Sequence, residues 1–282
     1  MARFAGIILL LTMIFSPAYA GTLRVISLYP GHSDNIAAMG GSEILVALSE
    51  NDDDDLLPEL PRVPLRSGAE RILALRPDVV ITRPFAERAS PNLYDVLRRS
   101  GVKVVSIDPP SWDDFPEYLR TLAEALNLDA ERAISRLNSI RDEISREAIK
   151  SSRPRVFLEA TSRELHTCSP YSWAARLIEL SGGVNIAGDA VPLRQGSAIA
   201  SWGSERVIKN AESIDIYIIQ TGAMNTSTIE SFKAREWAGA LKNVMVCEIP
   251  ERYISRPSLL GLERGGRELL RIFRGEVSED AR

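Results

Sequence analysis

The fold of this protein is decided by residues 111–152, SWDDFPEYLRTLAEALNLDAERAISRLNSIRDEISREAIKSS. Apolar residues recur there every three or four positions, for example at Leu119, Leu122 and Leu126, which is typical of an amphipathic helix. Residues 127–129 (NLD) predict a break, with Asp129 capping a longer second part. That part should hold about twenty residues and measure roughly 30 Å at 1.5 Å per residue.

Short apolar strands alternate with amphipathic helices on both sides of this stretch. Such alternation predicts βαβ units and parallel sheets that are covered by helices on both faces. The predicted strands are 23–28, 44–48, 77–82, 102–108, 155–160, 214–219 and 244–249. The predicted helices are 33–39, 69–75, 91–100, 172–181, 204–210, 226–233 and 258–273.

The predicted fold is therefore α/β, with two Rossmann-like lobes that contain parallel sheets. The first lobe spans residues 21–110 and the second residues 153–282, and a single long backbone helix over 111–152 joins them. A stiff helical connector should permit little lobe closure, in contrast to a hinge of flexible strands.

The N-terminus, residues 1–20 (MARFAGIILLLTMIFSPAYA), has the layout of a signal peptide. Arg3 precedes an apolar run, and Ala18-Tyr19-Ala20 is a small-x-small cleavage site. The run is too short to span about 30 Å of hydrocarbon. Because no cysteine lies near the cleavage point, we expect an exported protein without a lipid anchor, not embedded in the membrane. In an oxidising compartment Cys168 and Cys247 could form a disulfide or remain two buried thiols.

The composition excludes several classes of function. The chain is 45% hydrophobic with a net charge of -4, which is typical of a globular protein and unfavourable for binding nucleic acid. It contains two histidines, His32 and His166, and two cysteines, without C-x-x-C or H-x-x-x-H spacing. A structural zinc module is therefore excluded.

Five segments carry a resemblance that covers essentially the whole mature chain. They are RVISLYPGHSDNIAAMG (24–40), LPRVP with SGAERILALRPDVVIT (60–82), YSWAARLIELSGGVNIAGD (171–189), SERVIKNAESIDIYII (204–219) and ISRPSLLGLERGGRELLRIF (254–273). The chain resembles the helical-backbone periplasmic substrate-binding proteins of ABC importers that carry cobalamin and ferric siderophores. It departs from that pattern at His32 and Asp34-Asn35, and at the acidic residues 51–55 (NDDDD), where the family usually has an aromatic-Pro-Pro segment.

The resemblance implies one docking carboxylate in each lobe, which pairs with arginines of the importer permease. Glu70 and Glu205 occupy these positions, each in a G-[AS]-E-R-[IV]-[LI] context that opens a helix. The alternative is that each Glu only stabilises its helix through the helix dipole.

The ligand should lie in the cleft outside the carboxyl ends of the strands. Loops that follow strands there are rich in aromatic and arginine side chains, which suit large, flat, partly anionic chelates. The candidates are Tyr29, His32, Arg83, Trp112, Tyr171, Trp173, Trp202 and Arg256, and we favour Arg83, Trp112, Tyr171, Trp202 and Arg256 among them. Each could instead pack a loop, and His32 could either ligate a metal axially or serve as a packing residue.

The predicted function is that of a periplasmic, monomeric, non-enzymatic protein without a cofactor, which hands a corrinoid or ferric siderophore to an importer. A receptor for bare zinc or manganese is a first alternative, but it needs about three His and a carboxylate in the cleft. An exported α/β enzyme is a second, but no G-x-G-x-x-G, P-loop or nucleophile elbow supports it. We interpret the Asp run 52–55 as a solvated loop, because the spacing and Gly of a calcium loop are absent.

Overall fold

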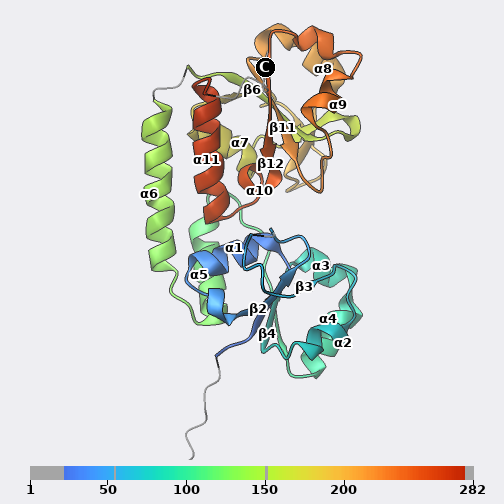
Figure 1. The fold of residues 1–282 in the computed structure, drawn as a ribbon, viewed down its shortest axis with the longest axis vertical. Helices are drawn as coiled ribbons and strands as arrows, with labels where there is room; N and C mark the ends of the chain where they lie inside the picture. Colours follow the sequence, from blue (N-terminus) through green and yellow to red (C-terminus); the bar gives the residue numbers. More distant parts are fainter. Residues whose placement is uncertain (1–21, 54, 150–151, 277–282) are drawn as a thin grey trace, which may run out of the picture.

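The computed structural model describes residues 22–53, 55–149 and 152–276, so the signal peptide predicted over 1–20 lies outside the described residues. Two α/β lobes are stacked along the long axis, and two long helices run beside each other along one side (Figure 1). This confirms the predicted fold class. Within the described residues, no helix combines the length and apolar character that crossing a membrane requires.

The first lobe contains a parallel sheet of five strands in the order β3-β2-β1-β4-β5. Its central strands are buried on both faces, as continuous apolar runs such as VVIT require. The strands are β1 (Val25–Ser27), β2 (Leu45–Ser49), β3 (Arg62–Val63), β4 (Val79–Thr82) and β5 (Lys103–Ser106). The helices are α1 (Pro30–Ala38), η1 (Ser42–Ile44), α2 (Ala69–Ala74), α3 (Pro84–Ala89) and α4 (Pro91–Arg99).

Helix α3 was not predicted from the sequence. It holds only six residues, with Pro84 at its start and Pro91 opening the next helix. Six residues are too few to show a helical repeat of apolar positions, although proline in a first turn favours a helix start there. This short helix matters because it forms part of the wall of the pocket described below.

The connector over 111–152 consists of two helices rather than one continuous helix. Helix α5 (Phe115–Leu126) ends at Asn127, which adopts the left-handed conformation at φ 55°. The Asp129 carboxylate then accepts a hydrogen bond from the Glu131 N–H (2.9 Å) at the start of α6 (Glu131–Ala148). The break therefore occurs where the NLD sequence predicted it. Helix α5 packs on the first lobe, which leaves α6 to run toward the second.

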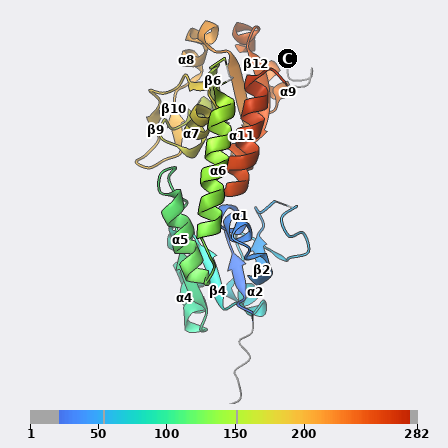
Figure 2. The same ribbon diagram turned by 90° about the vertical axis from the view of Figure 1, so that its left-hand side faces the viewer.

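Helix α6 lies beside the last helix, α11 (Leu259–Phe273), in both views (Figures 1 and 2). Gly266 of α11 permits this close packing, and Gly265 permits a close approach of α11 to the chain segment that precedes it. A Cβ at Gly266 would lie 2.2 Å from Cδ1 of Ile144, and one at Gly265 would lie 1.9 Å from the Tyr253 carbonyl oxygen. The two lobes are thus joined by a packed pair of helices, which is stiffer than a single helix.

The second lobe contains a mixed sheet of seven strands, so the prediction of parallel sheets holds only for part of it. The order is β12-β11-β6-β7-β10-β9, with β8 paired to β6. Strands β7, β9 and β10 are antiparallel to their neighbours. The reason is the short connection from β6 to β7, a single turn (η2, Arg163–Leu165), because a parallel neighbour needs a crossover of a dozen or more residues.

The elements that were predicted for the second lobe lie close to their expected ranges, whereas β7, β8, β9, β10 and α10 were not predicted. The strands are β6 (Arg155–Thr161), β7 (His166–Cys168), β8 (Val184–Asn185), β9 (Val191–Pro192), β10 (Ile199–Ser201), β11 (Ile216–Thr221) and β12 (Met245–Pro250). The helices are α7 (Trp173–Leu180), α8 (Ser204–Lys209), η3 (Ala211–Ser213), α9 (Ile229–Lys233), η4 (Ala238–Leu241) and α10 (Glu251–Ile254).

The two cysteines are free and buried. Cys168 lies on β7 and Cys247 on β12, and two strands separate them in the sheet. At roughly 4.8 Å per strand they lie about 14 Å apart, far beyond the reach of a disulfide. Burial raises the pKa of the Cys168 thiol to about 11. Of the two possibilities that the sequence left open, the structure therefore shows two thiols.

Asn35 of α1 ties the lobes together at the foot of α11. Its amide nitrogen donates to the Pro257 carbonyl (3.1 Å), and its side-chain oxygen accepts from the Leu259 N–H (3.2 Å). Asn35 is fully buried, so losing either bond would leave a polar group without a partner inside the protein. This contact fixes the base of the cleft between the lobes.

Candidate ligand-binding pocket

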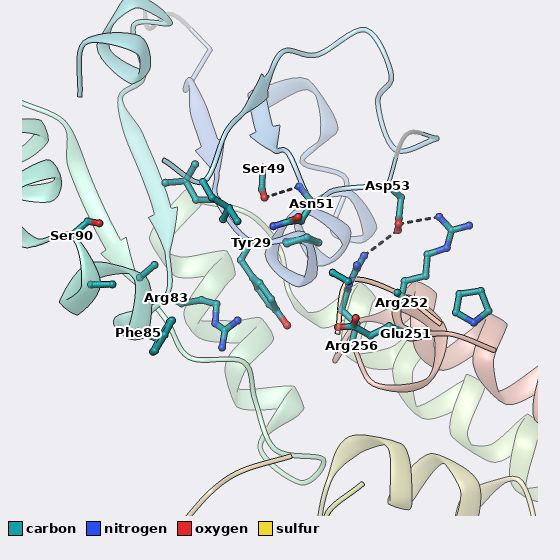
Figure 3. Close-up of a pocket in the computed structure, with 18 of the residues that line it drawn as sticks. Tyr29, Ser49, Asn51, Asp53, Arg83, Phe85, Ser90, Glu251, Arg252 and Arg256 are labelled. Atoms are coloured by element: carbon teal, nitrogen blue, oxygen red, sulfur yellow. Dashed lines mark hydrogen bonds and ion pairs between the residues drawn. The ribbon is translucent and has the colours of Figure 1, made fainter. Parts of the chain in front are cut away.

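A pocket of about 650 Å³ lies between the lobes (Figure 3). Its lining comes largely from residues that follow the carboxyl ends of parallel strands: β1, β2 and β4 in the first lobe, β11 and β12 in the second. Strand order thus gathers distant parts of the chain at one edge, where ligands bind in open α/β sheets. The polar and charged lining residues are Tyr29, Ser49, Asn51, Asp53, Arg83, Ser90, Tyr94, Thr221, Glu251, Arg252 and Arg256.

Tyr29 and Arg83 form the polar centre of the first-lobe wall. Tyr29 precedes α1 and Arg83 precedes α3, and the Arg83 guanidinium carbon lies 4.6 Å from the centroid of the Tyr29 ring. Burial raises the pKa of Tyr29, so its hydroxyl stays protonated and can donate to a ligand. In Figure 3 this hydroxyl lies between the Arg83 and Arg256 side chains.

Arg83 makes no ion pair with a carboxylate in the described parts of the chain, and its buried Nε has no hydrogen-bond partner. An unpaired polar nitrogen inside a protein costs about 1–3 kcal/mol. The Arg83 side chain lines the pocket, so a ligand oxygen with negative charge would form a charge-assisted hydrogen bond with its guanidinium group. Among the three pocket arginines, Arg83 is the one without a carboxylate partner in the described residues, so we expect it to bind an anion most readily.

Leu65 and Phe85 give the same wall apolar area. Both line the pocket, and both are large side chains exposed to solvent, Leu65 at 69% and Phe85 at 59%. A single exposed apolar side chain needs no explanation, but two beside a polar pocket suit a ligand with flat or aliphatic surface.

The second-lobe wall is charged and contains small residues. Thr221 ends β11, Gly222 and Ala223 follow it, and Glu251 and Arg252 lie on α10. Asp53 of the first lobe pairs with Arg252 (2.9 Å) and with Arg256 (3.0 Å), as the dashed lines in Figure 3 show.

The interpretation of the acidic loop as solvated is therefore wrong for Asp52 and Asp53, whereas Asp55 is exposed. Asp52 is only 5% exposed, and its carboxylate accepts from the Ser49 N–H (2.8 Å). Burial raises the pKa of Asp52 to about 7 and that of Asp34 to about 6. Asp53 is drawn inward by arginines from a part of the chain about two hundred residues away, which no local pattern reveals.

Of the eight candidate ligand-binding residues, the structure brings together Tyr29, Arg83 and Arg256 at this pocket. The other five are placed elsewhere among the described residues. His32 is fully buried, with Nδ1 2.7 Å from the Tyr118 hydroxyl and Nε2 3.1 Å from the Ile107 carbonyl. Burial lowers the His32 pKa to about 4, so the ring is neutral and both nitrogens are engaged inside the protein.

Trp112 and Trp173 pack against each other near the junction of α5 and α7. Their ring centroids lie 4.7 Å apart, and Trp173 also meets Phe115 edge-on at 5.0 Å. Arg141 of α6 stacks on Trp112 and donates to its carbonyl (2.7 Å). These two tryptophans thus anchor the connector and lie outside the pocket lining, contrary to expectation.

Trp202 and Tyr171 are also placed away from the pocket. Trp202 is 6% exposed, stacks on Phe157 at 5.3 Å and donates its indole N–H to Asp189 (2.9 Å). Tyr171 is 85% exposed in the turn before α7. A sequence shows that an aromatic residue follows a strand, but not which side of the sheet its ring meets.

Glu70 and Glu205 both lie in the first turn of a short helix, α2 and α8 respectively. Both are exposed, and within the described residues neither forms an ion pair. Helix α2 belongs to the lower lobe of Figure 1 and α8 to the upper lobe. The two lobes thus each present one unpaired carboxylate.

Several pocket residues were missed by sequence reasoning, although one signal could have found them. Asn51 follows β2, Thr221 ends β11 and Glu251 follows β12. The strand-end rule applies to them as it does to Tyr29 and Arg83. The expected ligand contacts were aromatic residues, histidines and arginines, so the small and acidic residues of the second-lobe wall were not predicted.

Comparison with known proteins agrees with this architecture. Residues 14–253 match the family model described as periplasmic binding protein. The chain is 32% identical over 203 residues to a vitamin B12-binding protein of Yersinia pseudotuberculosis, covering 68% of this chain and 70% of that protein.

Two solved structures share the fold at 20% identity. A possible iron-binding periplasmic solute-binding protein of Staphylococcus epidermidis has a TM-score of 0.70, with 88% of this chain and 96% of that chain covered. The periplasmic heme-binding protein RhuT of Roseiflexus has a TM-score of 0.68, with 90% and 97% covered. On the family match and the curated relative, this chain belongs to the periplasmic binding proteins, the substrate-binding components of ABC importers.

Proposed function

We propose that this protein binds an organic metal chelate, of the corrinoid, haem or ferric-siderophore type, in the pocket between its lobes and delivers it to an ABC importer. The single observation that carries the proposal is the pocket of about 650 Å³ with Tyr29 and an uncompensated Arg83 beside apolar Leu65 and Phe85. That combination suits a large ligand with both flat apolar surface and an anionic or carbonyl oxygen. The relative that binds vitamin B12 supports this class of ligand.

A chelate fits the residues better than a bare ion does. The lining contains two carboxylates and no histidine or cysteine, and Asp53 is already paired with two arginines. In the described part of the chain, no three His, Cys, Asp or Glu side chains gather closely enough to hold a metal ion. The pocket offers hydrogen bonds, charge and apolar contact, which are the means of holding a metal already wrapped in an organic ligand.

We further propose that residues 1–20 direct export and are removed, that the mature chain is a monomer without enzymatic activity, and that Glu70 and Glu205 dock it on the permease. Both glutamates are exposed and lack ion-pair partners among the described residues, so they can pair with arginines of another protein.

Calorimetric titration tests the ligand class directly. The mature protein should bind at least one of cyanocobalamin, cobinamide, haem, a neutral ferric trihydroxamate and a ferric tricatecholate with micromolar affinity or better. Free zinc and manganese are the controls. Tight binding of a free ion combined with no binding of any chelate would overturn the proposal in favour of a bare-metal receptor.

A further inference from the structure

The pocket is lined by three arginines, but two of them are already paired with a carboxylate of the protein. Its charged lining residues are the three arginines Arg83, Arg252 and Arg256 and the two carboxylates Asp53 and Glu251. The arginines differ in their surroundings. Arg83 has no carboxylate partner in the described chain, whereas Arg252 and Arg256 both pair with the same residue, Asp53.

Asp53 is placed to neutralise both arginines at once. Its Oδ1 lies 2.9 Å from Nη1 of Arg252 and its Oδ2 lies 3.0 Å from Nη1 of Arg256, so each oxygen serves one guanidinium. The Asp53 side chain is 14% exposed and that of Arg256 is 12% exposed, so water screens the Arg256 pair only weakly. Asp34, buried behind, lies 3.9 Å from the same Arg256 nitrogen.

Hydrogen bonds from β3 and from the end of β2 hold the loop that carries Asp53 in position. Arg62 of β3 donates to the Asp53 carbonyl (2.9 Å) and to the Leu56 carbonyl (3.0 Å). On the other side, the buried Asp52 carboxylate accepts from the Ser49 N–H. These bonds involve the Asp53 backbone and its neighbours, so the Asp53 carboxylate is presented to the arginines by a preorganised loop.

We propose that Asp53 is a charge-selectivity residue: a built-in counter-ion that occupies Arg252 and Arg256 and thereby limits how much negative charge the pocket accepts. This inference rests on the proposed function. A ligand with one anionic group can bind Arg83 without disturbing Asp53. A ligand with several anionic groups must compete with Asp53 for the second-lobe arginines, and it meets the repulsion of Asp53 while doing so.

Two iron chelates of opposite character test this selectivity. A ferric trihydroxamate with an uncharged backbone is neutral, because three hydroxamates balance the charge of Fe³⁺, whereas a ferric tris-catecholate carries three negative charges. Both present the same metal in a similar coordination. The measured quantity is the ratio of affinities between Asp53→Asn and the wild type for each chelate, by calorimetry at low salt. Asparagine keeps the size of the side chain and removes its charge.

We expect Asp53→Asn to bind the trianionic chelate at least about tenfold more tightly than the wild type, since one opposing charge is removed next to two arginines. Affinity for the neutral chelate should change less than about threefold. The gain should shrink in high salt, because screening weakens the competing attraction. Glu59→Gln is the matched control: it removes an exposed charge from the same loop with no arginine contact in the described structure, and neither affinity should change.

The inference is judged on the change in affinity from the wild type to Asp53→Asn, and the proposed function on binding by the wild type alone. If the wild type binds no chelate but Asp53→Asn binds the trianionic one, the inference stands while the ligand class must be revised. The inference is overturned if the variant fails to bind the trianion or binds it no better than the wild type does. It is also overturned if both chelates change equally. Circular dichroism and the melting temperature verify that the variant is folded.

Discussion

The two walls of the pocket are built on opposite principles. The first-lobe wall combines an aromatic ring, apolar side chains and an arginine without a partner, whereas the second-lobe wall combines small residues with arginines that Asp53 already neutralises. Trp173 and Trp202 of the second lobe are buried in the interior, so the second-lobe wall contains no aromatic side chain that could contact a ligand. We therefore expect the first lobe to supply most of the binding energy and the second lobe to determine which ligand charge the pocket accepts.

The two lobes should be equivalent in the proposed docking glutamates, Glu70 and Glu205, and removing both should have the largest effect. We expect Glu70→Ala/Glu205→Ala to lower uptake by about a hundredfold or more in a reconstituted transport assay, because charged pairs at a protein interface govern orientation and encounter. Ligand affinity should stay within about twofold. The single variants should lose comparable amounts.

Glu43→Ala and Glu212→Ala are matched controls for docking, since each removes an exposed glutamate from one lobe and neither forms an ion pair in the described structure. Normal uptake by the double docking variant would eliminate the docking hypothesis. A large loss from only one single variant would show that the lobes are not equivalent.

The next largest effect should separate the two walls. Arg83→Ala should weaken the binding of an anionic chelate by about 2 kcal/mol, roughly thirtyfold, because it removes a charge-assisted hydrogen bond to an uncompensated group. Arg252→Ala should cost less than about tenfold, since Asp53 already shields that guanidinium. Titration of both variants, with the exposed Arg88→Ala of α3 as control, measures the difference. Equal losses of affinity in Arg83→Ala and Arg252→Ala would contradict the proposed difference between the two walls.

The tryptophans should distinguish packing from binding. Trp173→Phe and Trp202→Phe should each lower the free energy of unfolding by about 1–3 kcal/mol, because both rings are buried and Trp202 also loses its bond to Asp189. Ligand affinity should change less than threefold. Tyr171→Ala, at an exposed position, should alter neither quantity by much. Denaturant unfolding curves and ligand titrations of the same samples measure both quantities. Weakened ligand binding by a Trp variant of unchanged stability would show that this residue contacts the ligand.

The last effect concerns stability alone and arises at the base of the acidic loop. Burial raises the pKa of Asp52 to about 7 from 3.8, so the folded protein binds more protons than the unfolded chain between those values. The stabilisation from this protonation is therefore present at low pH and is lost as pH rises through about 7. Asp52→Asn lacks this titration, so its stability relative to the wild type should improve by roughly 2–3 kcal/mol between pH 5 and pH 8.

Unfolding curves of both proteins at the two pH values measure this difference. The lowered pKa of His32 acts in the opposite direction, but it is common to both proteins and cancels in the comparison. An unchanged difference between pH 5 and pH 8 would mean that Asp52 is ionised in the folded protein without penalty.

The sequence predicted the elements well where apolar periodicity was long. Strands such as β4 and β11 and helices such as α11 lie within a few residues of their predicted ranges, because burial demands continuous apolar strands and a regular helical stripe. It failed where the signal was short or nonlocal. The six residues of α3 carry no repeat, and the antiparallel strands between β6 and α8 depend on a tight turn.

The pocket residues likewise divide into those that a local sequence signal located and those that it misplaced. The strand-end rule located Tyr29, Arg83 and Arg256 from the sequence, because the carboxyl ends of parallel strands meet at one edge. The rule does not specify side-chain direction, and so it also selected His32, Trp173 and Trp202, which point into the protein.

The sequence by itself determined the two α/β lobes, the helical connector with its break, and the matching glutamates that open one helix in each lobe. Each of these depends on local periodicity or on a short motif. Only the tertiary structure decided that Asp53 neutralises Arg252 and Arg256, that Arg83 is left without a partner, and that the tryptophans serve the interior. The physical reason is that electrostatic pairing and burial depend on distances in space between residues up to about two hundred positions apart, which local sequence patterns do not encode.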